Sequence, residues 1–270
     1  MVLLLGFNHL SSIYEIPAFE DEDIVEEELK IISYNVRQFN QYGFDKQKNV
    51  PEKITVFFKE EDPDIIGMQE YFRGELAVAE RFPHRYIKLK TESAEFGLAI
   101  FSKFPIINSG SLDFATVSNN NGIFADIATP TDTIRVINVH LQSYSLKPDL
   151  NNLEKEKSKR VFLGMGQTFA KQQDQMEQVF KLIDESTYPV ILLGDFNNTA
   201  YSYIYREVLA RGLKDSFKEG GSGFGRTFDF DFFPLRIDFI LVDESMQVNS
   251  FETEEVHYSD HFPVKAKISL

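Results

Sequence analysis

Polar side chains stand at the ends of apolar, strand-like segments of this sequence, inside one of them or just before another, at positions that a packed core would reject. They are Asn35, Glu70, His140, Asp195, Asn197, Asp238, Asp260 and His261. A buried carboxylate without a partner is very costly, so each of these groups needs a partner or access to water. If the fold gathers them at one rim, they form a reactive centre.

The chemistry of such a centre follows from its charges. Two unit charges about 4 Å apart interact by about 4 kcal/mol at an effective dielectric constant of about 20, so crowded carboxylates need protons or a cation. Oxygen ligands without cysteine suit Mg²⁺, Mn²⁺ or Ca²⁺ better than zinc. The histidines His140 and His261 add acid–base or phosphate-binding capacity near neutral pH. This set indicates metal-assisted chemistry on an anionic substrate.

Taken singly, these residues have ordinary structural explanations. Asn35 is typical of a strand-end cap, His140 of a structural histidine, and the segment 195–197 of a turn. Asp238 is harder to explain in this way, because apolar residues flank it on both sides. The catalytic hypothesis therefore depends on the residues taken together.

The surrounding pattern predicts the elements that must position these residues. Apolar runs rich in β-branched residues predict strands at 29–36, 64–70, 86–89, 97–102, 124–128, 133–140, 190–195, 236–242 and 264–268. Pro130 marks a hairpin between two of them. Helical spacing predicts helices at 51–58, near 167–186 and at 201–211, with a long polar segment at 143–159. Many strands and few helices favour two packed sheets with helices outside.

Composition narrows the class of protein. The chain has 270 residues, 43% of them hydrophobic, which is enough for one globular domain. We expect residues 1–27 to be a peripheral segment and residues 28–270 to form the domain. The absence of cysteine excludes disulfides, thiolate nucleophiles and cysteine-bound zinc. The net charge of −14 disfavours tight nonspecific binding to nucleic acid.

Six motifs in a fixed order carry a resemblance to a known superfamily. They are Ser33-Tyr34-Asn35-Val36-Arg37, Met68-Gln69-Glu70, Asn138-Val139-His140, Leu193-Gly194-Asp195-Phe196-Asn197, Arg236-Ile237-Asp238-Phe239-Ile240 and Ser259-Asp260-His261-Phe262-Pro263. From about residue 29 to residue 270, the chain resembles the endonuclease/exonuclease/phosphatase superfamily. The resemblance implies an α/β fold, a four-layer sandwich of two mixed β-sheets packed face to face with helices outside. It also implies hydrolysis of a phosphate ester with Mg²⁺ or Mn²⁺, with Ca²⁺ as an alternative.

The resemblance also implies a role for each residue. Glu70 would be the principal metal ligand, helped by Asn35, and Asp260 would bind or steer a metal. Asp195 would orient or deprotonate the attacking water beside Asn197. The catalytic set would be completed by His140, Asp238 and His261, with Asp238 fixing the tautomer of His261. The residues expected to contact substrate are Arg37, Arg226 and Thr227.

The substrate stays open at this stage. His140 and Arg37 resemble the deoxyribonuclease branch and favour a phosphodiester, as in a nuclease. A phosphatase or phospholipase-type enzyme acting on a small-molecule or lipid-headgroup phosphoester is an alternative, and a non-catalytic binding module is another. No stable protein partner is implied, and we expect a monomer. No run of about 18 apolar residues exists, so we expect a soluble domain, with a possible membrane tether through a segment preceding residue 1.

Overall fold

A computed structural model describes residues 11–16, 28–44, 46–74, 81–91, 94–114, 120–144, 155–230 and 233–270, and for 155–162 only the backbone. The helical elements are η1 (Arg37–Asn40), α2 (Val50–Glu61), α3 (Lys155–Asp184), α4 (Tyr203–Leu209) and α5 (Ser216–Gly220). The strands are β1 (Tyr14–Glu15), β2 (Leu29–Asn35), β3 (Ile65–Phe72), β4 (His84–Leu89), β5 (Phe96–Ser102), β6 (Ile106–Ser111), β7 (Asn121–Ala128), β8 (Thr133–His140), β9 (Val190–Asp195), β10 (Leu213–Asp215), β11 (Gly223–Phe224), β12 (Asp238–Asp243), β13 (Gln247–Thr253) and β14 (Val264–Ser269).

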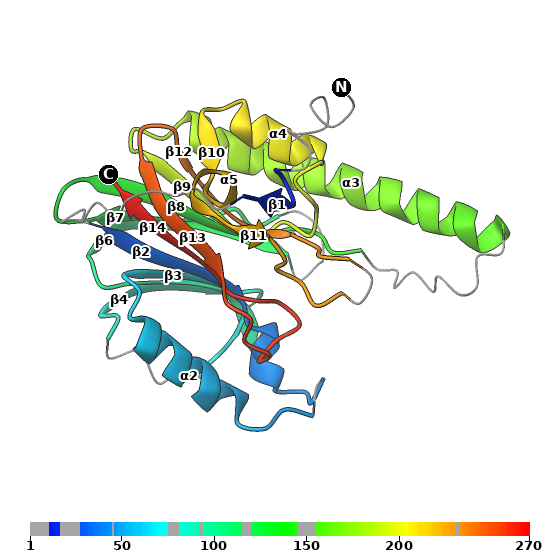
Figure 1. Cartoon of the computed structure of the whole chain (residues 1–270), viewed down its shortest axis with the longest axis horizontal. Coiled ribbons are helices and arrows are strands. Elements are labelled where there is room, and N and C mark those ends of the chain that lie inside the picture. Colours follow the sequence, from blue (N-terminus) through cyan, green and yellow to red (C-terminus); the bar gives the residue numbers. More distant parts are fainter. Residues whose placement is uncertain are drawn as a thin grey trace.

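Two six-stranded sheets face each other at the centre of the molecule (Figure 1). One has the strand order β10-β12-β9-β8-β7-β6, and the other has the order β13-β14-β2-β3-β5-β4. Helix α2 covers the outer face of the second sheet, whereas α3 and α4 cover the outer face of the first (Figure 1). These layers confirm the predicted four-layer α/β sandwich.

The central strands are buried on both faces. In β2, Ile31 belongs to the core between the sheets, whereas Ile32 and Tyr34 pack in the core beneath α2. Strands covered on both faces are apolar almost throughout, which is why the sequence shows continuous apolar runs. Strands β2 and β3 are parallel, and so are β8 and β9. The residues that end these four strands therefore gather at one rim of the sandwich.

Helix α2 is amphipathic and lies close to its predicted position. Four apolar side chains at helical spacing face the sheet, Val50, Ile54, Phe57 and Phe58. Pro51 lies in the first turn, where its missing N–H is not needed. Asp62 takes a left-handed conformation and ends the helix before Pro63. Burying each such apolar side chain contributes about 1.5–3 kcal/mol, which fixes this helix over the sheet.

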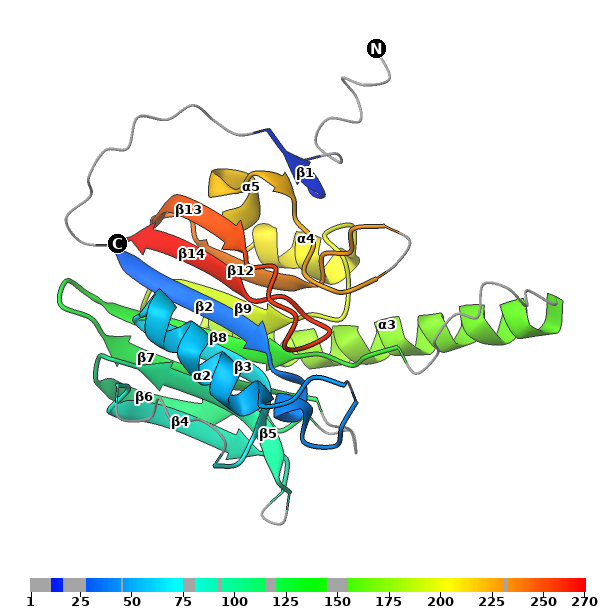
Figure 2. The same cartoon turned by 60° about the horizontal axis from the view of Figure 1, so that its bottom comes forward.

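Helix α3 and the edge strands differ from the prediction. Helix α3 begins at residue 155 instead of near 167, and its amino-terminal part extends beyond the sheets (Figure 2). Among the side chains described, which start at Leu163, Leu163 and Met165 are exposed and the first buried one is Thr168, so these turns show no buried apolar face. The strands β6 and β13 were absent from the prediction because they lie at sheet edges and are half polar. The hairpin of β7 and β8 around Pro130 is confirmed.

Part of the amino-terminal segment packs on the domain. Within residues 1–27 the structure describes 11–16, where β1 pairs with β11. The carbonyl of Ser12 accepts two hydrogen bonds, at 3.1 and 3.0 Å, from the buried guanidinium of Arg236. Residues 1–10 and 17–27 lie outside the described residues, and the domain boundary at residue 28 stays a prediction. Within the described part, no helix is both long and apolar enough to cross a membrane.

Candidate active site

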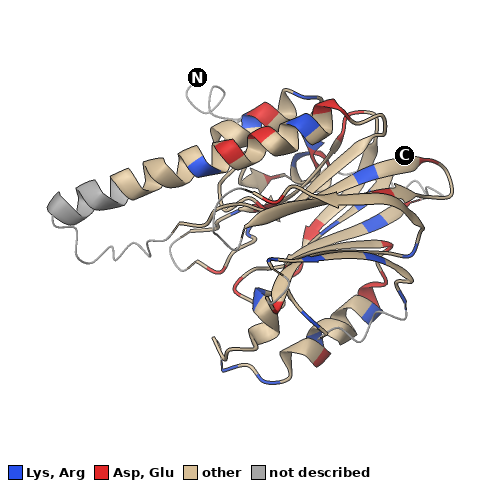
Figure 3. Ribbon diagram, turned by 180° about the vertical axis from the view of Figure 1, so that it is seen from behind, with Lys and Arg blue, Asp and Glu red and all other residues tan. Residues whose placement is uncertain are grey.

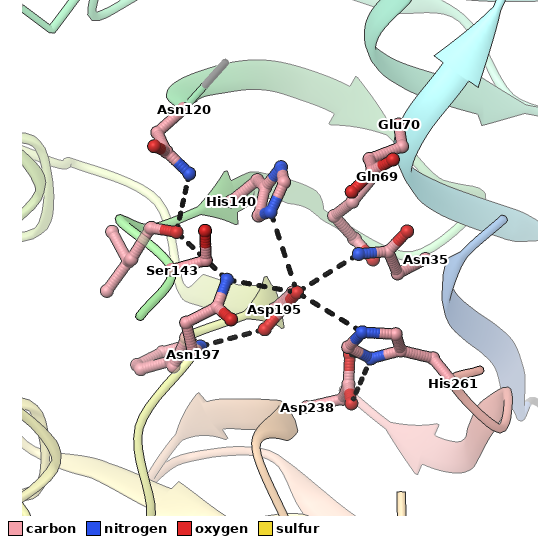
Figure 4. A network of polar contacts seen from close by, with 12 residues as sticks. Asn35, Gln69, Glu70, Asn120, His140, Ser143, Asp195, Asn197, Asp238 and His261 are labelled. Carbon is pink, nitrogen blue, oxygen red and sulfur yellow. Dashed lines mark hydrogen bonds and ion pairs between the residues drawn. The ribbon is translucent and has the colours of Figure 1, made fainter. Parts of the chain in front are cut away.

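The rim where the parallel strands end brings together residues that are far apart in the sequence. Asn35 is opposite Gln69 at the end of β2, and His140 is opposite Asp195 at the end of β8. Asp238 begins the antiparallel strand β12 directly opposite Asp195. Register groups the side chains within each sheet, and the packing of the two sheets joins these groups into one cluster, in which Asn35 contacts Asp195 (Figure 4).

Asp195 is the hub of this cluster and is only 1% exposed. Its Oδ2 accepts hydrogen bonds from Asn35 Nδ2 at 3.0 Å and Asn197 Nδ2 at 3.2 Å, and its Oδ1 accepts one from Asn197 N at 2.8 Å. Two imidazole nitrogens also approach Oδ2, His140 Nε2 at 3.6 Å and His261 Nε2 at 3.7 Å (Figure 4). Asp195 is thus held as an acceptor between two histidines.

Asp238 and His261 form a buried pair behind the hub. His261 Nδ1 lies 3.1 Å from Asp238 Oδ1 and 2.9 Å from Asp238 Oδ2. Burial alone lowers the pKa of His261, but the charges of Asp238 and Asp195 outweigh it and raise that pKa to about 10. Burial raises the pKa of Asp238 to about 6, although the attraction of His261 opposes this. At neutral pH the pair is an imidazolium beside a carboxylate, with Nε2–H directed toward Asp195.

Thr227 fixes the backbone that carries Asp238. Its hydroxyl oxygen accepts hydrogen bonds from Ile237 N at 3.0 Å and Asp238 N at 3.1 Å. The residue is fully buried. In this structure Thr227 therefore positions the backbone of β12. The substrate contact expected of Thr227 stays a prediction.

Two outer carboxylates, Glu70 and Asp260, lie at the same rim and are half-buried. Glu70 Oε2 accepts a hydrogen bond from Gln38 Nε2 at 2.9 Å. Asp260 Oδ2 is 3.2 Å from Arg37 Nε, so Arg37 pairs with a carboxylate in this structure. The expected metal ligands Glu70 and Asp260 are therefore each bound to a residue of η1, the turn that follows β2.

Arg226 belongs to a loop that packs against His261. Its guanidinium pairs with Asp229 and lies over the Phe262 ring, with Cζ 5.1 Å from the ring centroid. Phe228 contacts the ring of His261 edge to face, with centroids 4.9 Å apart. The loop thus covers the histidine, and the side chain of Arg226 is one-third exposed at its edge.

Sequence reasoning missed several glutamine and asparagine side chains that hold the site. Gln172 of α3 donates to the carbonyls of Gln142 and Asn197 at 2.7 and 3.1 Å, and it accepts from Asn198 Nδ2 at 2.8 Å. Asn138 donates to carbonyls of β3 and β5 at 2.9 and 3.0 Å, between the sheets. Two sequence features could have identified them: Asn138 is an amide inside an apolar run, and Gln172 is an amide on the buried face of a helix.

The sequence profile of the Endonuclease/Exonuclease/phosphatase family matches residues 32–261, which include the motifs of the site from Asn35 to His261. The chain belongs to this family. A comparison with curated proteins found no match. Family membership rests on the profile, which spans most of the chain.

Solved structures of the endonuclease/exonuclease/phosphatase family share the fold. D. rerio TDP2 complexed with a single-strand DNA product is 16% identical, with a TM-score of 0.67, over 91% of this chain and 100% of that one. A mannosyl-6-phosphatase of Bacteroides thetaiotaomicron is 23% identical, with a TM-score of 0.64, over 90% of this chain and all of its own. A family protein of Bacteroides vulgatus is 19% identical, with a TM-score of 0.68, over 91% and 100%. At these identities the likeness concerns the fold alone.

Proposed function

We propose that this chain is a divalent-metal-dependent phosphoesterase that hydrolyses a phosphodiester. The observation that carries the proposal is the buried Asp195 carboxylate, set between two imidazoles and two amide donors at the rim of a fold that its family uses for phosphoester hydrolysis. Such a group can accept a proton from water, while the donors around it contact an anionic phosphate.

The donor set fits a hard divalent cation. Among the residues that the structure describes, Asp195, Asp238 and His261 offer ligand atoms within 4.8 Å of one another. We favour a position nearer Glu70 and Asp260 instead, because His261 and Asp238 already bind each other and are almost fully buried.

The excess of negative charge at the rim also favours a bound cation. Among the residues that the structure describes, the four carboxylates of the rim pair with two cationic groups, Arg37 and the protonated His261, so negative charge is in excess there. Glu70, Asp260 and Asn35 would hold Mg²⁺ or Mn²⁺, with Ca²⁺ as an alternative. When bound, the cation would supply positive charge that offsets the negative charge of the phosphate.

The residues of the chain would then divide the work. Asp195 would orient the attacking water and take its proton, and Asn197 would keep the carboxylate in place. His261 Nε2–H would donate to a phosphate oxygen, because the carboxylate of Asp238 accepts from Nδ1–H and its charge helps to keep both ring nitrogens protonated. His140, on the other side of Asp195, would contact a second oxygen or the leaving group. Arg37 and Arg226 would bind substrate at the edge of the site.

A small phosphomonoester is the second candidate, and the charge of the molecule favours it over a long nucleic acid. The net charge is −14, and on the side seen in Figure 3 lysine and arginine are interspersed with aspartate and glutamate. The net charge would repel a polyanion, whereas one phosphate bound through a cation would not be repelled. A short phosphodiester agrees both with the proposed diester chemistry and with the repulsion of long polyanions by the net charge.

Hydrolysis of bis(p-nitrophenyl) phosphate and p-nitrophenyl phosphate, with Mg²⁺, Mn²⁺ or Ca²⁺, tests the proposal and separates the two candidates. We expect faster turnover of the diester, and a loss of about 10²–10⁴-fold in kcat for Asp195→Asn, Glu70→Gln and His261→Ala. His84→Ala, at the start of the edge strand β4, is the matched control. Undiminished rates in the three site variants would remove the assignment, and wild-type protein without turnover on any phosphoester would favour a binding module.

A further inference from the structure

The turn that follows β2 has an unusual backbone. The residues of η1, Arg37, Gln38, Phe39 and Asn40, have φ values of 44°, 55°, 52° and 57°. All are in the left-handed region, although none is glycine. In this region the Cβ of an L-residue crowds the following carbonyl, so such residues occur mostly singly. A run of this kind persists only where its surroundings fix it, and strain of this kind concentrates at functional sites.

Packing and hydrogen bonds fix this turn. Phe39 is 1% exposed, and its ring lies 5.8 Å from that of Tyr71, centroid to centroid. Asn40 Nδ2 donates to the carbonyl of Gln47 at 3.0 Å. The backbone closes on itself through Gln41 N, which donates to the carbonyl of Gln38 at 3.0 Å. On the other side of Gln38, Arg37 N donates to Asn35 Oδ1 at 3.1 Å, so the turn is anchored both before and after Gln38.

The turn aims two side chains at the outer carboxylates. Gln38 is 8% exposed, and its Nε2 donates to Glu70 Oε2 at 2.9 Å. Arg37 reaches Asp260 Oδ2 at 3.2 Å. Glu70 is itself left-handed, with φ of 53°, in a stretch of β3 where the register with β5 shifts. Two strained backbone segments thus meet in one hydrogen bond.

We propose that Gln38 is a positioning residue that orients the Glu70 carboxylate for the divalent cation, and that the left-handed turn exists to place it. The inference rests on the proposed metal site. An amide fits this task because it donates to a carboxylate without bringing a positive charge that would oppose the cation. Partners that orient metal ligands typically change metal affinity by about 10–100-fold when they are removed.

Titration of the metal-free protein with MnCl₂ by isothermal calorimetry tests this role without catalysis. Gln38→Met keeps the length of the side chain and removes the donor, so we expect the Kd for Mn²⁺ to rise by about 10–100-fold. Gln41→Met, at an exposed position of the same turn, is the matched control and should bind as wild type. An unchanged Kd in Gln38→Met would overturn the inference, whereas wild-type protein that binds no Mn²⁺ would overturn the proposed metal site itself.

A second variant separates positioning from simple structural support. Gln38→Asn keeps the amide but is one methylene too short to reach Glu70, and asparagine tolerates the left-handed region better than glutamine. We expect weaker Mn²⁺ binding, by a similar factor, with no loss of Tm in the metal-free protein. If Tm and affinity fell together, Gln38 would support only the turn, and the inference would be wrong.

Discussion

At the scale of single residues, the pairing of Asp238 with His261 illustrates how burial and charge compete. Burial disfavours a charged imidazole, yet the neighbouring carboxylates Asp238 and Asp195 more than offset it, and the pKa of His261 rises to about 10. The same carboxylate of Asp238 holds the ring through Nδ1. Asp238 therefore orients the ring of His261 and also contributes to its charge.

Removing the charge of Asp238 should disable His261 while the fold persists. In Asp238→Asn, burial would act on His261 with less opposition and its pKa would fall, so we expect a loss of about 10²–10⁴-fold in kcat on bis(p-nitrophenyl) phosphate. Asp243→Asn, at the other end of the same strand β12, is the control, because its carboxylate bonds only Ser245 of the following turn among the residues described. Equal rates in both variants would contradict the assigned role.

The predictability of the site follows from where each residue lies. Asp195, Asp238 and His261 could be predicted because a charged group beside apolar strand residues demands an explanation. The structure brings them together, although their catalytic roles remain proposals. Gln38 could not be predicted, because its importance depends on a left-handed backbone that non-glycine residues rarely adopt.

At the scale of elements, Lys265 of β14 links the end of α2 to β13. Its Nζ lies 2.8 Å from Glu61 Oε2, 2.8 Å from Glu254 Oε1 and 3.0 Å from Glu252 Oε2. Burial lowers the pKa of Lys265, but the hydrogen bonds to these three glutamates outweigh it and hold the pKa well above its ordinary value. Its hydrogen bond in turn lowers the pKa of Glu252.

Lys265→Met should therefore destabilise the fold in a pH-dependent way. A raised lysine pKa contributes stability below about pH 10.4, which is lost as the pH rises through the folded value. A lowered glutamate pKa contributes stability above about pH 4.3, which is lost as the pH falls. We expect the difference in unfolding free energy from wild type, measured in urea, to be about 1–3 kcal/mol at pH 7 and smaller at both extremes.

Lys267→Met is the control for that experiment, since Lys267 lies on the same strand, is 43% exposed and pairs only loosely with Glu28 at 3.5 Å. A surface pair of this kind contributes about 0–1 kcal/mol. If the effect of Lys265→Met did not depend on pH, the packing of the lysine side chain and not its charge would stabilise the link.

The elements themselves divide into those that the core dictates and those that it does not. Strands β2, β3, β8 and β9 were predictable because both faces are buried. The edge strand β13 alternates polar and apolar residues only weakly, and the early turns of α3 have no sheet beneath them. Local sequence carries little information where tertiary packing is absent.

At the scale of the whole molecule, an acidic protein concentrates carboxylates from several strands at one rim. Burial of Asp195 and Asp238 beside the half-buried Glu70 and Asp260 costs folding free energy, because like charges repel and lose hydration. A divalent cation that binds only the folded state lowers this cost. Metal binding and global stability should therefore be coupled.

Thermal unfolding with and without metal tests this coupling. Adding Mg²⁺ or Mn²⁺ at about 100 times its Kd should stabilise the EDTA-treated protein by about 2.7 kcal/mol, and for a chain of this length each kcal/mol raises Tm by about 2–4 °C. Glu70→Gln removes one negative charge from the rim, so its metal-free form should be at least as stable as wild type while its Tm responds far less to metal. NaCl of equal ionic strength controls for screening. A wild-type Tm that is the same with metal and with EDTA would mean that the carboxylates of the rim are stabilised by protein contacts alone, and the cation would then have no place in the folded site.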